Sequence, residues 1–280
     1  MKAKKLKLLF INPSLRLWSP TKYLPVGIGS IMTFVREHGF DFDLLDVDIY
    51  DHNDDFVENF IAENRYDVVL TGCIVTHYKW TKWLTHKIRG YHPETVIIVG
   101  NSVGGSTPEV FLRNSAADFS VIGEGEFTCL ELLQALRDGT PTNGVEGIAY
   151  LDDEGKFIQT PKRKACNINE LPFVDWEIFD MERYFKKSDH AGAEGLVFEE
   201  SKPPRVMPVA TARGCAFRCT FCHFVFWDDP YRFRTPQNIL KEIQRNIEKY
   251  GATYINFWDD LSFAGLQQAE KMADAILESG

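Results

Sequence analysis

Three cysteines close together in the chain, Cys215, Cys219 and Cys222, carry the clearest chemical signal in this sequence. They form a CxxxCxxC pattern, with the aromatic Phe221 directly before the third cysteine. Thiolates are soft ligands that suit iron-sulfur chemistry, and three of them on one short loop can each bind one iron of a four-iron cluster. The fourth iron would then lack a protein ligand. This favours a cluster that binds and reduces a small molecule over one that only carries electrons.

A structural zinc site is the main alternative for these cysteines. Structural zinc is usually closed by four protein ligands, and its cysteines usually occur as CxxC pairs. The nearest fourth ligand is His223, whose position next to Cys222 makes tetrahedral closure awkward. Disulfides are disfavoured, because six cysteines in 280 residues and an N-terminal apolar run that stops at Asn12-Pro13, too early for a signal peptide, indicate a reducing compartment.

The residues around the cysteines predict alternating strands and helices. Thr235 and Pro236 suit the N-cap and first position of a helix, and apolar residues then recur at helical spacing until Gly251. A strand–helix–strand–helix order predicts the first part of a parallel (β/α) partial TIM barrel, with chemistry at the carboxyl ends of its strands. The expected elements are a strand at 206–212, a helix at 236–250, a strand at 253–258, and a helix at 265–279.

The first half of the chain predicts an α/β domain with a doubly wound, Rossmann-like parallel sheet. Its strands are near-continuous apolar runs, as expected when helices cover both faces of a sheet. Ligands of such domains bind outside the carboxyl ends of the strands. The expected strands lie at 6–12, 42–47, 67–71, 96–99 and 119–122, and the expected helices near 27–37, 56–63, 77–89, 108–114 and 127–136.

Small residues follow three of these strands, and they predict a ligand site at that edge of the sheet. Glycine lets the backbone approach a large flat ligand and donate N–H groups at helix N-termini. A plain turn is an equally good interpretation of any single glycine. A GxGxxG dinucleotide fingerprint is missing after the first strand, which disfavours a nicotinamide cofactor. The three segments are Thr71-Gly72, Gly100 to Thr107, and Gly123 to Glu126.

Composition narrows the partners that the chain is expected to bind. The net charge of −9 disfavours nucleic acid, since a polyanion would be repelled. No run approaches the roughly 18 apolar residues that a membrane span needs. We therefore expect a cytoplasmic protein that acts on a small molecule.

The cysteine loop resembles the signature of the radical S-adenosylmethionine (SAM) superfamily, in which an aromatic residue also precedes the third cysteine. The resemblance implies a [4Fe-4S] cluster whose open iron binds SAM, and reductive cleavage of SAM to methionine and a 5′-deoxyadenosyl radical. It also implies that Phe221 lies near the adenine and that Asp259 and Asp260 contact the methionine end or the ribose of SAM. A solvated turn or a helix cap is the alternative role for the two aspartates.

A second resemblance links the first half of the chain to the cobalamin-binding domains that precede many radical SAM domains. It rests on residues 25–29, Leu45-Asp46, Val99-Gly100 and above all Gly123-Glu-Gly-Glu126, and on the connector-like segment 171–184. The resemblance implies cobalamin, with its cobalt, as a cofactor held by loop backbone. The implied cobalamin contacts are Thr71, Gly72, Gly100, Ser102, Gly104, Gly105, Gly123, Glu124, Gly125 and Glu126.

Together these observations predict three segments. They are a cobalamin-binding domain at 1–140, a linker with a hairpin and several aromatic residues at 141–205, and a radical SAM domain at 206–280. The last segment has room for two strand–helix units, whereas radical SAM domains of this kind have a larger partial barrel. We therefore expect a truncated domain, and little SAM cleavage by residues 1–280 alone.

The resemblance implies a methyltransferase that acts on an unactivated carbon of a small molecule, natural product or lipid. A flavodoxin or ferredoxin would donate electrons. Cyclisation or rearrangement is the alternative reaction, and a non-catalytic cobalamin or redox sensor is the alternative class of protein. No histidine of the chain has an aspartate two positions before it, so the DxHxxG loop that places imidazole on cobalt is missing. We therefore expect no histidine ligand on the cobalt.

Overall fold

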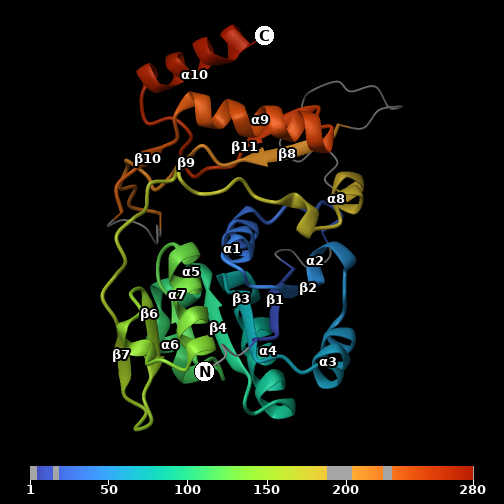
Figure 1. Ribbon diagram of the computed structural model, residues 1–280, viewed down its shortest axis with the longest axis vertical. Coiled ribbons are helices and arrows are strands. Elements are labelled where there is room, and N and C mark those ends of the chain that lie inside the picture. Colours follow the sequence, from blue (N-terminus) through green and yellow to red (C-terminus); the bar gives the residue numbers. More distant parts are fainter. Residues whose placement is uncertain (1–4, 15–18, 188–203, 223–228, 280) are drawn as a thin grey trace. The chain divides into compact units, whose positions relative to one another are not determined.

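The computed structural model describes residues 5–14, 19–187, 204–222 and 229–279 of the chain. The chain forms two compact units, whose elements are labelled in Figure 1. The N-terminal unit comprises residues 1–19 and 27–163, and the C-terminal unit comprises residues 20–26 and 164–280. The short segment 20–26 thus belongs to the C-terminal unit, although it lies between the first strand and the first helix of the chain.

A seven-stranded sheet with the order β2-β1-β3-β4-β5-β6-β7 forms the centre of the N-terminal unit. Strands β1 to β5 pair in parallel, and β6 and β7 continue the sheet in antiparallel pairing. The first five strands have the 2-1-3-4-5 order of a doubly wound domain, which confirms the predicted fold class. The strands are β1 (Leu8–Asn12), β2 (Phe42–Asp46), β3 (Val68–Gly72), β4 (Val96–Gly100), β5 (Phe119–Val121), β6 (Ile148–Leu151) and β7 (Phe157–Gln159).

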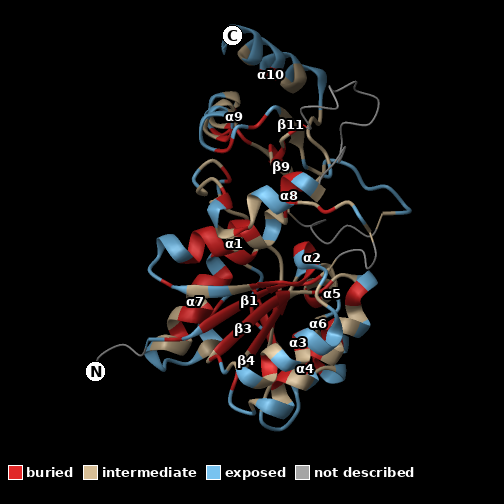
Figure 2. Cartoon of the chain, turned by 90° about the vertical axis from the view of Figure 1, so that its right-hand side faces the viewer, coloured by how far each residue is buried: buried red, intermediate tan, exposed pale blue. Residues whose placement is uncertain are grey.

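Helices cover both faces of this sheet. Figure 2 shows α1 and α7 on one side and α3, α4 and α6 on the other. Their bounds are α1 (Val26–Glu37), α3 (Asp54–Glu63), α4 (Tyr78–Tyr91), α6 (Pro108–Asn114) and α7 (Gly125–Asp138). Shorter helices are α2 (Val47–Tyr50), α5 (Asn101–Ser106), η1 (Val75–His77) and η2 (Thr142–Gly144).

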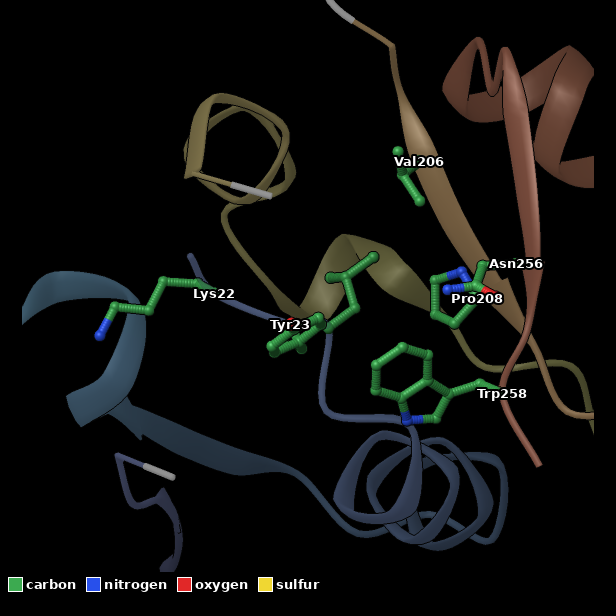
Figure 3. A pocket seen from close by; sticks show the side chains of 7 residues that line it. Lys22, Tyr23, Val206, Pro208, Asn256 and Trp258 are labelled. Atoms are coloured by element: carbon green, nitrogen blue, oxygen red, sulfur yellow. The ribbon is translucent and has the colours of Figure 1, made fainter. Parts of the chain in front are cut away.

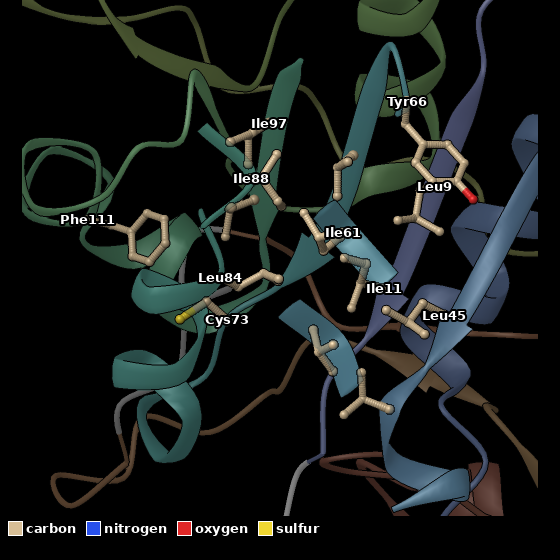
Figure 4. Close-up of a cluster of buried hydrophobic side chains, with 14 residues drawn as sticks. Leu9, Ile11, Leu45, Ile61, Tyr66, Cys73, Leu84, Ile88, Ile97 and Phe111 are labelled. Carbon is tan, nitrogen blue, oxygen red and sulfur yellow. The ribbon is translucent and has the colours of Figure 1, made fainter. Parts of the chain in front are cut away.

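Alternate strand residues pack against the helices on each face, which explains the continuous apolar runs in the sequence. On the face covered by α3, α4 and α6, the strand residues Leu9, Val69 and Ile97 pack with helix residues such as Leu84 and Phe111 (Figure 4). All five residues of β1 are buried, since this strand lies inside the sheet between β2 and β3.

Two local features differ from the sequence-based expectation. The hairpin expected in the linker forms β6 and β7, and β6 pairs with β5, so the hairpin belongs to the N-terminal sheet. The glycine-rich run after β4, expected to be a loop, forms the short helix α5. The N-terminal compact unit therefore extends to residue 163, beyond the boundary at 140 expected for the first domain.

A β–α–β unit forms the centre of the C-terminal unit. Strands β8 (Val206–Val209) and β11 (Tyr254–Phe257) pair in parallel and are connected through α9 (Pro236–Tyr250). The side chain of Thr235 caps α9 by accepting from the N–H of Asn238, and Gly251 ends the helix in the left-handed conformation, as predicted. The remaining elements are η3 (Trp176–Ile178), α8 (Met181–Lys187), β9 (Ala212–Arg213), β10 (Arg232–Phe233) and α10 (Leu266–Ser279).

The aromatic residues expected in the linker contribute to the core of the C-terminal unit. Trp176, Phe179 and Tyr184 are buried, and consecutive ring centroids in this series lie 6.0 and 6.1 Å apart. The backbone N–H of Trp176 donates to the hydroxyl of Tyr250 on α9 at 3.2 Å.

Among the helices that the structure describes, none is long and apolar enough to cross a bilayer.

Gly147, at the start of the β6–β7 hairpin, allows a test of this sheet extension. Its φ is +78°, and an added Cβ would lie 2.9 Å from Thr128 Oγ1 and 3.2 Å from the Ile122 carbonyl oxygen. Gly155 has a similar φ of +74°, but an added Cβ there would meet open space. We expect Gly155→Ala to lower the free energy of unfolding by about 1 kcal/mol, and Gly147→Ala by about 2–3 kcal/mol. Urea unfolding of both variants measures the difference, and equal losses would contradict the packing of the hairpin on α7.

Candidate functional site

The strand order of the N-terminal unit predicts where a ligand binds. The order reverses between β1 and β3, which lie side by side, and open α/β sheets bind ligands outside the carboxyl ends of their strands at such a switch point. Gly72 at the end of β3 pairs with Gly100 at the end of β4. Two of the three small-residue segments are therefore adjacent at this edge, as predicted. The hydroxyl of Thr71 donates to the Ile11 carbonyl at 3.0 Å, so it binds β1 within the sheet.

The segment after β4 uses its glycines for close packing. A Cβ on Gly104 would lie 3.1 Å from Ser120 Oγ, and a Cβ on Gly105 would lie 3.4 Å from the Val121 carbonyl oxygen. The hydroxyl of Ser120 on β5 donates to the Gly104 carbonyl at 2.7 Å. These glycines let α5 approach β5. The N–H of Ser102 is bound by the side chain of Asn101 at 2.6 Å.

The segment after β5 leads into α7 and packs closely against α1. Gly123 has a φ of +80°, and a Cβ on Gly125 would lie 2.5 Å from Ile31 Cδ1 on α1. The carboxylate of Glu126 is buried and accepts from the hydroxyl of Ser30 at 2.6 Å. A Cβ on Gly105 would lie 3.8 Å from the Gly123 nitrogen, so the segments after β4 and β5 also lie next to each other. The roles of these residues and of Glu124 in binding cobalamin stay predictions.

Sequence reasoning missed the hydrogen bonds among a group of polar residues at and just after the ends of β1 and β2. Asn12 Nδ2 donates to Asp46 Oδ1 at 2.8 Å, and Ser14 Oγ donates to Asp48 Oδ1 at 2.6 Å. Asn12, Asp46 and Asp48 are all buried. The signal in the sequence was a set of polar residues directly after apolar strands, but their pairing is long-range and could not be predicted from local pattern.

His77, in the turn after β3, is a further residue whose setting the sequence did not indicate. It is 6% exposed, and its Nδ1 lies 3.2 Å from Thr81 Oγ1. Its Nε2 is buried without a hydrogen-bond partner among the residues that the structure describes. Burial lowers the pKa of His77 to about 4, although the negative charge of Asp48 acts in the opposite direction. The ring is therefore neutral at physiological pH.

This buried imidazole predicts a loss of stability on acidification. The unfolded chain binds a proton at His77 near its ordinary pKa of 6.5, whereas the folded chain binds it only near pH 4. Stability from this group is therefore complete above pH 6.5 and falls by up to about 3 kcal/mol as the pH drops toward 4. We expect His77→Leu to flatten that part of the curve of unfolding free energy against pH. The control variant His86→Gln, at an exposed position, should keep the wild-type fall in unfolding free energy over this pH range. If His77→Leu also keeps the wild-type curve, the buried neutral imidazole is not the cause of the fall.

The loop with the three cysteines begins directly after β9 in the C-terminal unit. Cys215 and Cys222 are partly exposed, Cys219 is exposed, and all three are free thiols. The N–H of Cys222 donates to the Cys219 carbonyl at 3.1 Å, and the N–H of Phe217 approaches Cys215 Sγ at 3.4 Å. Three free thiols on one accessible loop fit the donor set of an iron-sulfur cluster.

Among the residues that the structure describes, this loop presents neither an assembled zinc site nor an assembled cluster site. Within the described ranges of the chain, no three His, Cys, Asp or Glu side chains are grouped closely enough to hold a metal ion. His223, the fourth ligand of the zinc alternative, lies outside the described residues. Binding of a cluster by Cys215, Cys219 and Cys222 therefore stays a prediction.

The three residues predicted to contact SAM have different surroundings. Asp259 is engaged within the fold, because its Oδ1 accepts from the N–H groups of Thr211 and Ala212 at 2.8 and 3.0 Å, and its Oδ2 accepts from the Thr211 hydroxyl at 2.6 Å. The pKa of Asp260 is raised, first by removal of its carboxyl from water and then by the charge of Asp259. Phe221 is 90% exposed, so its ring is accessible to a ligand.

A hollow of about 300 Å³, open to solvent, lies against β8 and β11 (Figure 3). Residues 22–24 form its other wall. The ring centroids of Tyr23 and Trp258 lie 5.1 Å apart. Val209 and Phe257 pack instead with α9 and α10, so the hollow is on the opposite face of the two strands from the helices. The lining residues are Lys22, Tyr23, Leu24, Val206, Pro208, Asn256 and Trp258.

Two family models match the chain in the order that the sequence predicted. The B12 binding domain matches residues 18–133, and the Radical SAM superfamily matches residues 209–278. The first match includes β2 to β5 with their following segments, and the second includes the three cysteines and both aspartates. The chain therefore carries a B12 binding domain match followed by a Radical SAM superfamily match, the combination that the two resemblances in the sequence implied.

Curated relatives cover nearly the whole chain at low identity. Cytidylyl-2-hydroxyethylphosphonate methyltransferase of Streptomyces wedmorensis is 25% identical over 98% of this chain and 58% of its own length. Anaerobic magnesium-protoporphyrin IX monomethyl ester cyclase of Rubrivivax gelatinosus is 26% identical over 91% of this chain and 45% of its own length. The chain thus spans about half the length of these relatives.

Solved structures share the fold of the whole chain. The cobalamin-dependent SAM radical enzyme OxsB, with aqua-cobalamin and SAM bound, matches 98% of this chain and 37% of its own, with a TM-score of 0.75 and 19% identity. The radical SAM methyltransferase TsrM from Kitasatospora setae, with cobalamin and a [4Fe-4S] cluster bound, matches 99% of this chain and 51% of its own, with a TM-score of 0.73 and 15% identity. Both comparisons confirm the fold class, a doubly wound domain followed by the start of a partial barrel.

Proposed function

We propose that the chain is part of a cobalamin-dependent radical SAM methyltransferase that modifies an unactivated carbon. The observation that carries this proposal is the free CxxxCxxC loop after β8, in a chain whose first half matches the B12 binding domain. Because the chain spans about half of its curated relatives, the activity is proposed for the whole protein. The methyltransferase relatives support methyl transfer as the reaction.

Three cofactors are part of this proposal: a [4Fe-4S] cluster, SAM and cobalamin. When they are bound, the cluster would supply an electron for SAM cleavage and cobalamin would carry a methyl group to the substrate. The thiolates of Cys215, Cys219 and Cys222 would hold the cluster. Phe221 offers an exposed ring for the adenine, and Asp260 offers a carboxylate that can accept hydrogen bonds from SAM.

Loop backbone at the carboxyl edge of the N-terminal sheet would hold cobalamin. The segments around Gly72, Gly100 and Gly123 lie next to one another there, which supports one continuous binding edge. Because the carboxylate of Glu126 is bound to Ser30, we assign this residue a backbone contact at most. The segment between β1 and α1, residues 13–25, contains no histidine, which supports a cobalt without a protein imidazole.

The proposed partners are a small-molecule, natural-product or lipid substrate and a flavodoxin or ferredoxin that donates electrons. A reducing, cytoplasmic setting suits thiols that must stay free to bind iron, and Cys215, Cys219 and Cys222 are free thiols. Cyclisation is a second candidate reaction, which the cyclase of Rubrivivax gelatinosus among the relatives supports. A sensor differs from both enzymes because it would form no 5′-deoxyadenosine from SAM under reduction.

The cluster assignment predicts the metal content of the protein. Anaerobic reconstitution should yield about four irons and four sulfides per chain, and Cys219→Ala should lose them, because two thiolates cannot hold the cluster stably. Cys166→Ala, a cysteine outside the loop, is the matched control and should retain them. Iron and sulfide analysis with electron paramagnetic resonance measures the outcome. One tightly bound zinc without sulfide would overturn the proposal.

The cobalamin assignment predicts the spectrum of bound cob(II)alamin. We expect binding without nitrogen superhyperfine splitting from an axial base, because residues 13–25, between β1 and α1, contain no histidine. Electron paramagnetic resonance of the reduced complex measures this. Splitting would contradict the prediction, and its loss in His77→Leu would identify His77 as the ligand. Failure to bind cobalamin would contradict the role proposed for the whole N-terminal unit.

A further inference from the structure

The backbone just before the cysteine loop is held on one side by a carboxylate. Asp259 accepts from two backbone N–H groups and one hydroxyl, all of which belong to Thr211 and Ala212. The register of the parallel strands explains this contact, because Val209 pairs with Phe257 and each chain then continues by two residues to Thr211 and Asp259. All of these donors lie within four residues of Cys215 in sequence.

Arg234 holds the same backbone through its carbonyl groups, one by the guanidinium and one by its own backbone N–H. Arg234 Nη1 donates to the Ala210 carbonyl at 2.7 Å, and the backbone N–H of Arg234 donates to the Thr211 carbonyl at 2.8 Å. Arg234 is 7% exposed and is fixed by α9, since it pairs with the buried carboxylate of Glu242 and donates to Asn238 Oδ1 at 2.6 Å. Residues 210–212 are therefore bound from both sides by charged groups, whose hydrogen bonds are stronger than those of neutral groups.

We propose that Asp259 and Arg234 are positioning residues that hold residues 210–212 so that the cysteine loop starts in a geometry suited to the cluster. Asp259 thus acts on the cluster through the backbone and does not bind SAM. Its three acceptor contacts occupy both carboxylate oxygens, whereas SAM contact is left to Asp260. This inference rests on the proposed cluster, but the hydrogen bonds that it invokes exist in the protein without metal.

The physical basis is preorganisation. Three thiolates must converge on one cluster, and Cys219 and Phe221 at the tip of the loop are exposed and have little support from the rest of the fold. Within the described part of the chain, the contacts that restrict the loop are therefore those at its base. Groups that orient metal ligands typically change metal affinity by about 10–100-fold when they are removed.

Asp259→Asn tests the proposal, because the amide nitrogen that replaces one oxygen cannot accept from the Thr211 hydroxyl, and the bonds to the two N–H groups lose their charge assistance. In protein without metal, hydrogen exchange at the amides of Thr211 and Ala212 should accelerate by roughly tenfold or more. In reconstituted protein, a chelator should remove iron roughly tenfold faster than from the wild type. Asp274→Asn, the same change at an exposed site on α10, should alter neither rate.

Asp260→Asn separates the two adjacent aspartates. We expect it to keep wild-type iron retention but to reduce the change that SAM causes in the spectrum of the reduced cluster. Asp259→Asn should lose iron faster than the wild type. When samples with equal cluster content are compared, it should keep the spectral change that SAM causes. If Asp259→Asn instead keeps normal exchange and iron retention but loses the response to SAM, the inference is wrong and Asp259 is a SAM contact.

A second variant covers the possibility that Asp259→Asn does not fold. Thr211→Val removes the hydroxyl donor alone, and we expect a smaller acceleration of exchange and iron loss in the same direction. Wild-type rates in Thr211→Val together with an unfolded Asp259→Asn would overturn the positioning role. If the wild-type protein assembles no iron and sulfide, the proposed function fails, whereas the exchange rates in metal-free protein still test the contacts of Asp259.

Discussion

Parallel pairing of strands is the constraint on which both sites depend. Parallel strands end at the same edge of a sheet, so the segments that follow them become neighbours although they are far apart in sequence. In the N-terminal unit this brings Gly72 opposite Gly100. In the C-terminal unit it brings Asp259 to Thr211, which begins the approach to the cysteines. The chemistry-bearing residues are thus placed at or just beyond the strand ends by the register of the largely apolar strands that lead to them.

This constraint explains which features could be predicted from the sequence. Buried strands, the Thr235 cap and the Gly251 terminus depend on local pattern, and the structure confirms them. Features set by distant partners could not be read from local pattern. The hairpin was assigned to the linker because nothing in residues 148–159 indicates pairing with β5, and the burial of His77 depends on the packing of other elements around the turn after β3. The hydrogen bonds of Asp259 to Thr211 and Ala212 could not be predicted for the same reason, since these partners lie far away in sequence, and its contact with SAM stays a prediction.

The glycines of the N-terminal unit show that a family signature can have a structural origin. Gly104, Gly105 and Gly125 each lie where a Cβ would meet a neighbouring element. Substitution there would displace α5 or α7 before it affected any ligand. The Gly-Glu-Gly-Glu element suits this fold because α7 starts close against α1. Gly125 leaves room for Ile31, and Glu126 accepts a hydrogen bond from Ser30. Any contact with cobalamin would come from the backbone that this packing positions.

The cysteine loop shows how a fold can support a site whose tip it barely touches. Gly214 lies at the base of the loop, where a Cβ would be 3.0 Å from the Pro230 carbonyl, and Arg213 pairs with Arg232 across β9 and β10. The proposed cluster would be anionic, so an uncompensated carboxylate close to it would be unfavourable, because like charges repel. The donors around Asp259 compensate its charge locally. The base of the loop is therefore held by strong charge-assisted hydrogen bonds, and the charge of Asp259 itself is matched by donors.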